Sequence, residues 1–197
     1  MTSSPDDTEC SDLAETNLSN HFLIAMPGLN DSNFAHSVTL ICEHNDEGAM
    51  GIVINNVLDL NMGEIFAQME LEAPAHVNQK PVLAGGPVQL ERGFVLHRTG
   101  KTWNSTLKIS EDISLTVSKD IIVAIAEEEA PPEAIVALGY AGWGAGQLEE
   151  EIAENTWLTL KADSDLIFDT PCEQRWSMAA RSLGIDLNLV SSTAGHA

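Results

Sequence analysis

Basic residues are scarce in this sequence, and they are unevenly placed. The chain has 9 lysines and arginines against 30 aspartates and glutamates, a formal net charge of -21, and the first basic residue is Lys80. Proteins that bind nucleic acid directly take most of their affinity from basic side chains that neutralise phosphates. Direct binding to DNA or RNA is therefore disfavoured, and the charge is typical of a soluble protein with an acidic surface.

Long apolar runs and an export signal are also lacking. The longest apolar runs, Phe22 to Met26 and Ile121 to Ala126, are far shorter than the ~20 residues that cross a bilayer. A secretory signal begins with a basic segment, whereas the first twenty residues contain acidic residues and no lysine or arginine. We expect a cytoplasmic protein with no membrane association.

Cysteines are few, and the common catalytic signatures are missing. Cys10, Cys42 and Cys172 lie far apart and form no C-x-x-C motif, so the sequence indicates neither a disulfide framework nor a zinc site. It also has no G-x-S-x-G elbow, H-E-x-x-H helix or Walker motif. We therefore assign no catalytic residue, no metal site and no cofactor from the sequence.

The composition is that of one globular domain. The chain has 197 residues and 44% hydrophobic residues, enough to bury a sizeable core in a single domain. Residues 1–18 are acidic and contain little that packs, so they predict a disordered leader. We expect residues 19–197 to form the domain.

Short β-rich runs and amphipathic segments alternate irregularly after the leader, which favours an α+β fold. Asn61 with Glu64 indicates a capping box at the start of a helix, as does Thr170 with Glu173. We expect strands over 21–26, 37–44, 50–56, 81–85, 93–98, 105–110, 113–118 and 134–143, a hairpin-like pair over 157–163 and 165–169, and helices over 61–69, 119–128, 147–155 and from 170 to Gly184.

Five segments of the chain resemble the YqgE/AlgH family of bacterial proteins. They are Asn20 to Asn56, Gly85 to His97, Leu138 to Leu158 with its GYAGWGAG stretch, Ile167 to Trp176 with IFDTPCEQRW, and the closing AGHA. The resemblance implies a mixed sheet, partly closed and barrel-like, with helices packed against it. It brings no agreed enzymatic activity. The name AlgH implies a transcriptional role in alginate production, which this acidic chain would perform indirectly.

Candidate binding residues lie in turns. Gly142, Trp143 and Gly144 stand between an expected strand and an expected helix, where glycines can hold a phosphate or simply form a tight turn. Asn55 and Asn56 end a strand, where their amides can fix a polar ligand or bond turn backbone. Gly85, Gly86 and Pro87 can bring backbone close to a ligand or only turn the chain.

Histidines and cysteines are the remaining candidates. His44 follows Cys42 and Glu43 at the end of a strand, where Glu43 and His44 should point to opposite faces. These are possible metal ligands, yet a metal site usually needs three or four ligands that converge. A solvated acidic turn is therefore the favoured explanation. Cys42 lies in an apolar run and is expected to be buried.

Two functions of different classes are consistent with these residues. The first is a non-catalytic binding or indirect regulatory module, in which loops 42–56, 85–87 and 142–146 converge on a groove for an unknown protein or small molecule. The second is an enzyme of unrecognised type that uses His44 or His97 with a carboxylate, or Cys42 as a thiol. A pocket that joins a histidine to an acid would favour the second.

Overall fold

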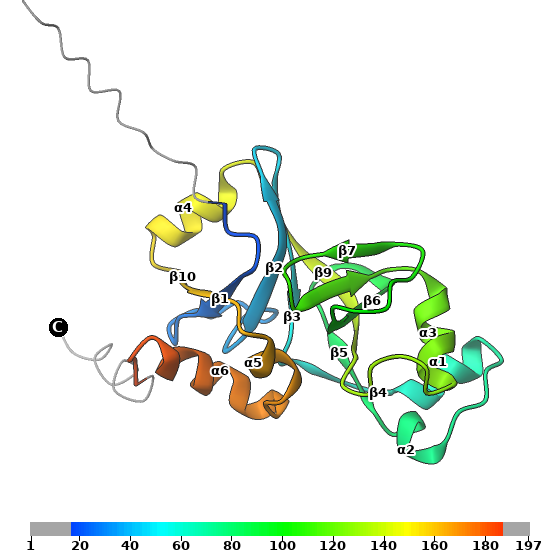
Figure 1. The fold of residues 1–197 in the computed structure, drawn as a ribbon. Helices are drawn as coiled ribbons and strands as arrows, with labels where there is room; N and C mark the ends of the chain where they lie inside the picture. The colour runs from blue at the N-terminus through cyan, green and yellow to red at the C-terminus, as the bar shows by residue number, and fades with distance from the viewer. Residues whose placement is uncertain (1–16, 187–197) are drawn as a thin grey trace, which may run out of the picture.

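The fold is built on one curled sheet. The computed structural model describes residues 17–186, within which ten strands and six helices form an α+β structure (Figure 1). The strands follow the order β10-β1-β2-β3-β9-β6-β8-β7, with β4 and β5 attached beside β9, and the sheet curls into an open half-barrel. None of the helices in this part of the chain is long and apolar enough to span a bilayer.

The elements alternate irregularly along the chain. The strands are β1 (His21–Ala25), β2 (Val38–Asn45), β3 (Gly48–Val53), β4 (Val57–Asn61), β5 (Pro81–Ala84), β6 (Val88–Arg98), β7 (Thr106–Lys108), β8 (Ile113–Thr116), β9 (Ile135–Gly144) and β10 (Trp157–Lys161). The helices are α1 (Met62–Gln68), α2 (Ala75–Asn78), α3 (Lys119–Ala126), α4 (Gln147–Ala153), α5 (Ser164–Phe168) and α6 (Cys172–Ser182).

Strand β9 is the centre of the sheet. Val136 pairs with Val82 of β5 and also with Val95 of β6, so these two strands lie on opposite edges of β9. The short link between β5 and β6 must therefore cross β9. A Cβ atom at Gly86 would lie only 2.1 Å from the carbonyl carbon of Tyr140, which shows how closely the backbones approach there.

Helices cover the sheet at two ends (Figure 1). Helices α1 and α3 pack on β5, β6 and β9 through a cluster that includes Phe66, Ile121 and Val95. Helices α5 and α6 pack on another cluster, which contains Phe94 and Leu96 of β6. Because Val95 belongs to one cluster and its neighbours to the other, the two faces of β6 have different surroundings.

Most of the expected elements are confirmed. The apolar runs over 21–26, 37–44 and 50–56 form β1, β2 and β3, and the run over 134–143 forms β9. The capping box at Asn61 is also present: Glu64 N donates to Asn61 Oδ1, and Asn61 N donates to Glu64 Oε2. Local apolar patterns and caps were sufficient for these elements.

Three local predictions differ from the structure. The segment expected as a strand over 165–169 lies in helix α5, because Asp163 Oδ1 accepts from Asp165 N and caps it. Thr170 does not cap α6: its hydroxyl donates to the carbonyl oxygen of Asp165, and Pro171 occupies the N-cap position. Strand β4, which pairs with β5, was not predicted.

The expected leader lies mostly outside the described residues. Its first sixteen residues are not part of the description, and the closing AGHA lies outside it as well. Leu18, at the end of the expected leader, is buried in a cluster with Trp143 and Trp157. The packed part of the chain therefore includes Leu18.

Candidate functional site

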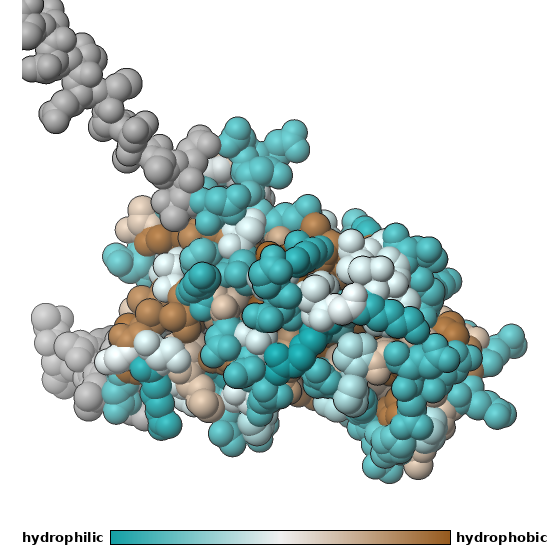
Figure 2. Space-filling view, in the orientation of Figure 1, coloured by the Kyte–Doolittle hydropathy of each residue, from teal (hydrophilic) through white to brown (hydrophobic). Residues whose placement is uncertain are grey.

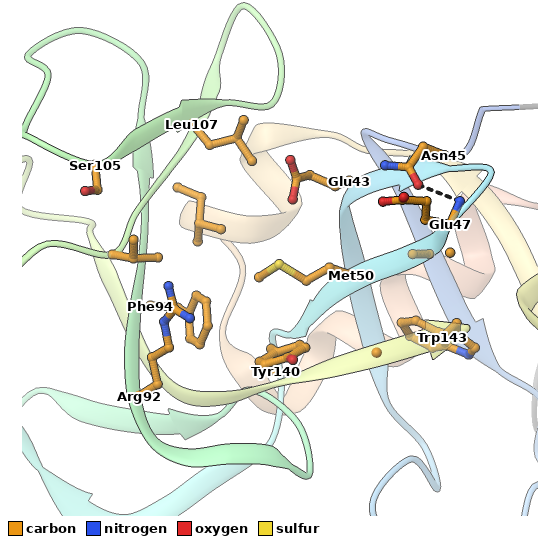
Figure 3. A pocket seen from close by; sticks show the side chains of 15 residues that line it. Glu43, Asn45, Glu47, Met50, Arg92, Phe94, Ser105, Leu107, Tyr140 and Trp143 are labelled. Atoms are coloured by element: carbon orange, nitrogen blue, oxygen red, sulfur yellow. Dashed lines mark hydrogen bonds between the residues drawn. The ribbon is translucent and has the colours of Figure 1, made fainter. Parts of the chain in front are cut away.

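A groove of about 610 Å³ opens on the concave side of the curled sheet (Figure 3). The β2–β3 hairpin forms one wall, strands β6, β7 and β8 form the other, and β9 runs along the floor. We call this the concave groove. Its lining includes Glu43, Asn45, Glu47, Met50, Arg92, Phe94, Ser105, Leu107, Tyr140, Gly142 and Trp143.

The floor of the concave groove is apolar and partly aromatic. Met50 and Tyr140 are half-buried, and the rings of Phe94 and Tyr140 meet edge to face with centroids 5.7 Å apart. Gly142 pairs with Met50 and adds no side chain, which keeps the floor open at that point. Apolar pockets in the mouths of β-barrels are common ligand sites.

Charges of both signs face this groove. Glu43 and Glu47 come from the β2–β3 hairpin, and Arg92 comes from the opposite wall, where its guanidinium lies 5.4 Å from the centre of the Phe94 ring (Figure 3). Arg92 Nη1 donates to Gln89 Oε1 at 3.3 Å, and none of the ion pairs within residues 17–186 includes Arg92. The guanidinium therefore remains able to bind a carboxylate.

One edge of β9 is open beside the groove. Residues Ala141 to Gly144 pair with β3 on one side, and the pairing of β9 with β6 ends at Tyr140. Among the described strands, none pairs with the other edge of Ala141 to Gly144, where the N–H of Gly144 donates to the side chain of Gln147. An unpaired edge can accept an added strand.

His44 lies outside the concave groove, on the other face of β2 from Glu43. Its Nδ1 accepts from Leu18 N at 3.0 Å, so Nε2 carries the proton and donates to Glu149 Oε1 at 2.6 Å. The pair joins a histidine to an acid, as the enzyme hypothesis requires, but it uses both ring nitrogens in bonds between structural elements. Neither is left to take a proton from a substrate.

His97 and Cys42 are buried. The carbonyl oxygen of Arg98 lies 2.9 Å from His97 Nδ1 and can only accept, so Nδ1 carries the proton and Nε2 accepts from the Thr116 hydroxyl at 2.8 Å. Burial lowers the pKa of His97, which favours this neutral form. Burial strongly raises the pKa of the Cys42 thiol, so the reactive thiolate is suppressed.

The asparagines and the Gly85-Gly86-Pro87 turn perform structural tasks. Asn55 accepts from Val38 N at 2.7 Å and donates to the carbonyl oxygen of His36, while Asn56 donates to that of Asn33. Both amides thus fix the loop between β1 and β2. Gly85, Gly86 and Pro87 form the link that crosses β9 and do not line the concave groove.

Only part of the glycine-rich stretch over 142–146 lines the concave groove. Gly142 and Trp143 line the concave groove, and Trp143 is otherwise buried with Phe34 and Trp157. Gly144 N donates to Gln147 Oε1, and α4 carries Glu149 and Glu150 in its first turn. These bonds and charges oppose a phosphate at this position.

Of the three loops expected to converge, two reach the concave groove, through Glu43 to Met50 and through Gly142 with Trp143. Met50, Arg92, Phe94 and Tyr140 were not among the site residues predicted from the sequence. The alternation of Arg92, Phe94 and Leu96 was a usable signal that these side chains share a face of β6. Within residues 17–186, no three His, Cys, Asp or Glu side chains converge so as to hold a metal ion.

Comparisons with known proteins give a consistent result. The family model described as AlgH-like matches residues 22–188. A UPF0301 protein of Saccharophagus degradans is 58% identical over 180 residues, which are 91% of this chain and 89% of the relative. A UPF0301 protein of Thioalkalivibrio sulfidiphilus is 55% identical over 184 residues, with 93% and 99% of the two chains covered.

Solved structures show the same fold. The solution structure of the AlgH protein from Pseudomonas aeruginosa matches with a TM-score of 0.76 and 45% identity, and the match covers 100% of both chains. The crystal structure of a protein from Corynebacterium diphtheriae matches with a TM-score of 0.69 over 88% of this chain and 91% of the other. At 20% identity, the second likeness concerns the fold alone.

Proposed function

The chain belongs to the AlgH-like family, and we propose that it is a non-catalytic binding module whose concave groove holds an extended segment of a partner protein. The observation that carries the proposal is the open edge of β9 at Ala141 to Gly144, which lies beside an apolar floor. A segment that adds a strand to this edge gains backbone hydrogen bonds, while pockets on the floor select its side chains.

The residues that line the concave groove indicate which side chains the bound segment carries. Its apolar side chain packs between Met50 and Tyr140, and its acidic residue meets the guanidinium of Arg92. Its basic residue faces Glu43 and Glu47 on the hairpin. Complementary charges at the two walls set the direction of the segment.

Catalysis by His44, His97 or Cys42 is less well supported. His44 uses both ring nitrogens, His97 bonds a hydroxyl and a carbonyl group, and the Cys42 thiol is protonated and buried. These arrangements stabilise the fold and leave no activated base or nucleophile in the concave groove. The non-catalytic function therefore accounts better for the geometry.

Any regulation would be indirect. The net charge of -21 opposes contact with a DNA backbone, so a transcriptional effect would pass through a protein partner in the cytoplasm. The regulatory role that the family name implies would then be carried out by binding a protein and not by binding DNA.

A peptide selection tests the proposal. A displayed library of random extended peptides is selected on the purified protein, and the selected peptides are measured by calorimetry and by amide chemical shifts. We expect binders with an apolar and an acidic residue, with shifts confined to β3, β6 and β9. Tyr140→Ala and Arg92→Glu should each weaken binding by about tenfold or more.

Met178→Ala is the matched control, because Met178 is an exposed apolar residue on α6, away from the groove. Its binding should equal that of the wild type. Peptides that bind the Tyr140→Ala variant as tightly as the wild type, or a selection that yields no binder, would contradict the proposal.

A further inference from the structure

One polar side chain already bonds the open edge of β9. Gln147 Oε1 accepts from Gly144 N at 3.0 Å, and Gln147 Nε2 donates to Glu151 Oε1 at 2.9 Å. Gly144 and Gln147 are both exposed. The carboxamide of a glutamine has a carbonyl acceptor and an N–H donor, as a peptide unit does. Gln147 therefore bonds the edge of β9 as the carbonyl group of an added strand would.

The N–H group of Gly144 is one of the groups that an added strand would use. In an antiparallel ladder, the backbone groups of successive residues point alternately to the two neighbouring strands. Gly144 N donates to Gln147, which is not part of β3, so this N–H faces the open edge. The alternation places the backbone groups of Gly142 on the same edge, and Gly142 lines the concave groove. A segment that leaves the groove along β9 reaches Gln147 next.

Glu151 holds Gln147 in this orientation. Glu151 Oε2 accepts from the indole N–H groups of Trp143 and Trp157 at 2.9 and 2.8 Å, and both rings are buried. These two bonds fix the carboxylate, whose Oε1 accepts from the amide of Gln147. Because the nitrogen of the carboxamide bonds Glu151, its oxygen is turned toward Gly144. The bond at the edge is thus arranged in advance by buried packing.

The surroundings of the edge keep it soluble without closing it. Gly48 pairs with Gly144, so the tip of the β2–β3 hairpin lies beside this edge and brings the exposed Asp46 and Glu47. Figure 2 shows hydrophilic residues over the tip of this hairpin, at the top of the view. Charged side chains and covering groups are common means of protecting strand edges. A single exposed hydrogen bond can be exchanged for one from a partner, because its net contribution is small.

We propose that Gln147 is a removable cap on the β9 edge. A partner's extended segment replaces the Gln147 carboxamide with one of its own backbone carbonyl groups at Gly144 N. This inference rests on the proposed function and adds a regulating step to it, because the free protein must release Gln147 before the edge pairs fully. The apparent affinity for the segment is lowered in proportion to the fraction of molecules whose edge is uncapped.

Gln147→Ala tests the cap, with a peptide selected on the wild-type protein as the probe. Alanine is a good helix former, so α4 should be retained, and thermal unfolding checks this. Since the peptide no longer competes with a carboxamide, its affinity measured by calorimetry should rise about two- to tenfold. Gln174→Ala is the matched control, because it makes the same change at an exposed residue of α6, away from the concave groove. It should bind the peptide as the wild type does.

Amide hydrogen exchange provides a second readout. In the free wild type the N–H of Gly144 is bonded to Gln147, so it should exchange about two- to tenfold more slowly than in free Gln147→Ala protein. In the peptide complex the same N–H should be equally protected in both proteins, because the carbonyl group of the peptide then accepts it. If Gln147 served only to start α4, the complex of Gln147→Ala would leave this N–H unprotected.

The outcomes separate this inference from the proposed function. Peptide that binds folded Gln147→Ala protein no more tightly than the wild type would refute the cap and leave the peptide-binding groove intact. An unprotected Gly144 N–H in the complex would refute it as well. If selection yields no peptide on either the wild type or Gln147→Ala, the protein-binding function itself is contradicted, and the cap with it.

Discussion

His44 donates from Nε2 to Glu149 Oε1 at 2.6 Å and thereby joins β2 to α4 across 105 positions of the chain. The same ring accepts the backbone N–H of Leu18 at Nδ1. One imidazole therefore connects the start of the packed chain, the central hairpin and a helix that follows β9.

His44→Ala should destabilise the protein by about 1–3 kcal/mol, because the part-buried N–H of Leu18 loses its acceptor. Glu149→Gln should cost only about 0–1 kcal/mol, since Glu149 is 53% exposed. Urea unfolding measures both. Equal costs for the two variants would mean that the bond to Leu18 contributes nothing.

His97 should make stability depend on pH. Burial lowers its pKa in the folded state, so the unfolded chain takes up the proton first. The stability that His97 contributes is complete above its pKa in the unfolded chain, about 6.5, and is lost as the pH falls through the lower folded-state pKa.

Urea unfolding of the wild type and His97→Gln at a series of pH values isolates this effect from that of the carboxylates. We expect the difference in stability between the two proteins to shrink as the pH falls below about 6.5. A difference that stays constant across this range would show that His97 does not titrate differently in the two states.

The link between β5 and β6 crosses β9 so closely that we expect no side chain to be tolerated at position 86. Its φ is 153°, and a Cβ atom there would lie 2.1 Å from the carbonyl carbon of Tyr140. Gly86→Ala should therefore cost about 3 kcal/mol or more. Gly93→Ala is the matched control, because its Cβ has open space, and we expect a change within about 1 kcal/mol. Thermal unfolding compares them, and a Gly86→Ala protein as stable as Gly93→Ala would refute the close crossing.

Glu151 accepts hydrogen bonds from two tryptophans and should stabilise the packing of both. Its Oε2 accepts from Trp143 Nε1 at 2.9 Å and from Trp157 Nε1 at 2.8 Å, and both rings are buried. Glu151→Ala leaves two indole N–H groups without this acceptor and should cost at least about 2 kcal/mol. Two indole N–H resonances should move in proton–nitrogen spectra.

Glu154→Gln, on an exposed residue at the end of α4, should leave both resonances and the stability unchanged. Unmoved indole resonances in the Glu151→Ala variant would show that these two bonds do not form in solution.

Local patterns were enough for many elements. The apolar runs of β1 to β3 and the capping box at Asn61 depend on neighbouring residues, so the sequence predicted them correctly. Helix α5 was missed because its five residues are too short to show a helical period. Thr170 has the residue types of a capping box, but its hydroxyl donates to the carbonyl oxygen of Asp165 instead.

The candidate site could be predicted only in fragments. Gly142 and Trp143 were selected and do line the concave groove, whereas Arg92 and Tyr140 were not. Asn55 and Asn56 were selected as possible binding residues, and the structure places both in bonds to loop backbone. A polar side chain in a turn has the same local sequence whether it binds a ligand or a neighbouring loop.

The sequence by itself determined the family resemblance, the acidic charge and the α+β character, because each depends on composition or on short-range order. The tertiary structure alone decided that Met50, Arg92 and Tyr140 surround one groove. These residues come from strands far apart in the chain. They are brought together by the curl of the sheet around β9, which arises from long-range strand pairing and packing.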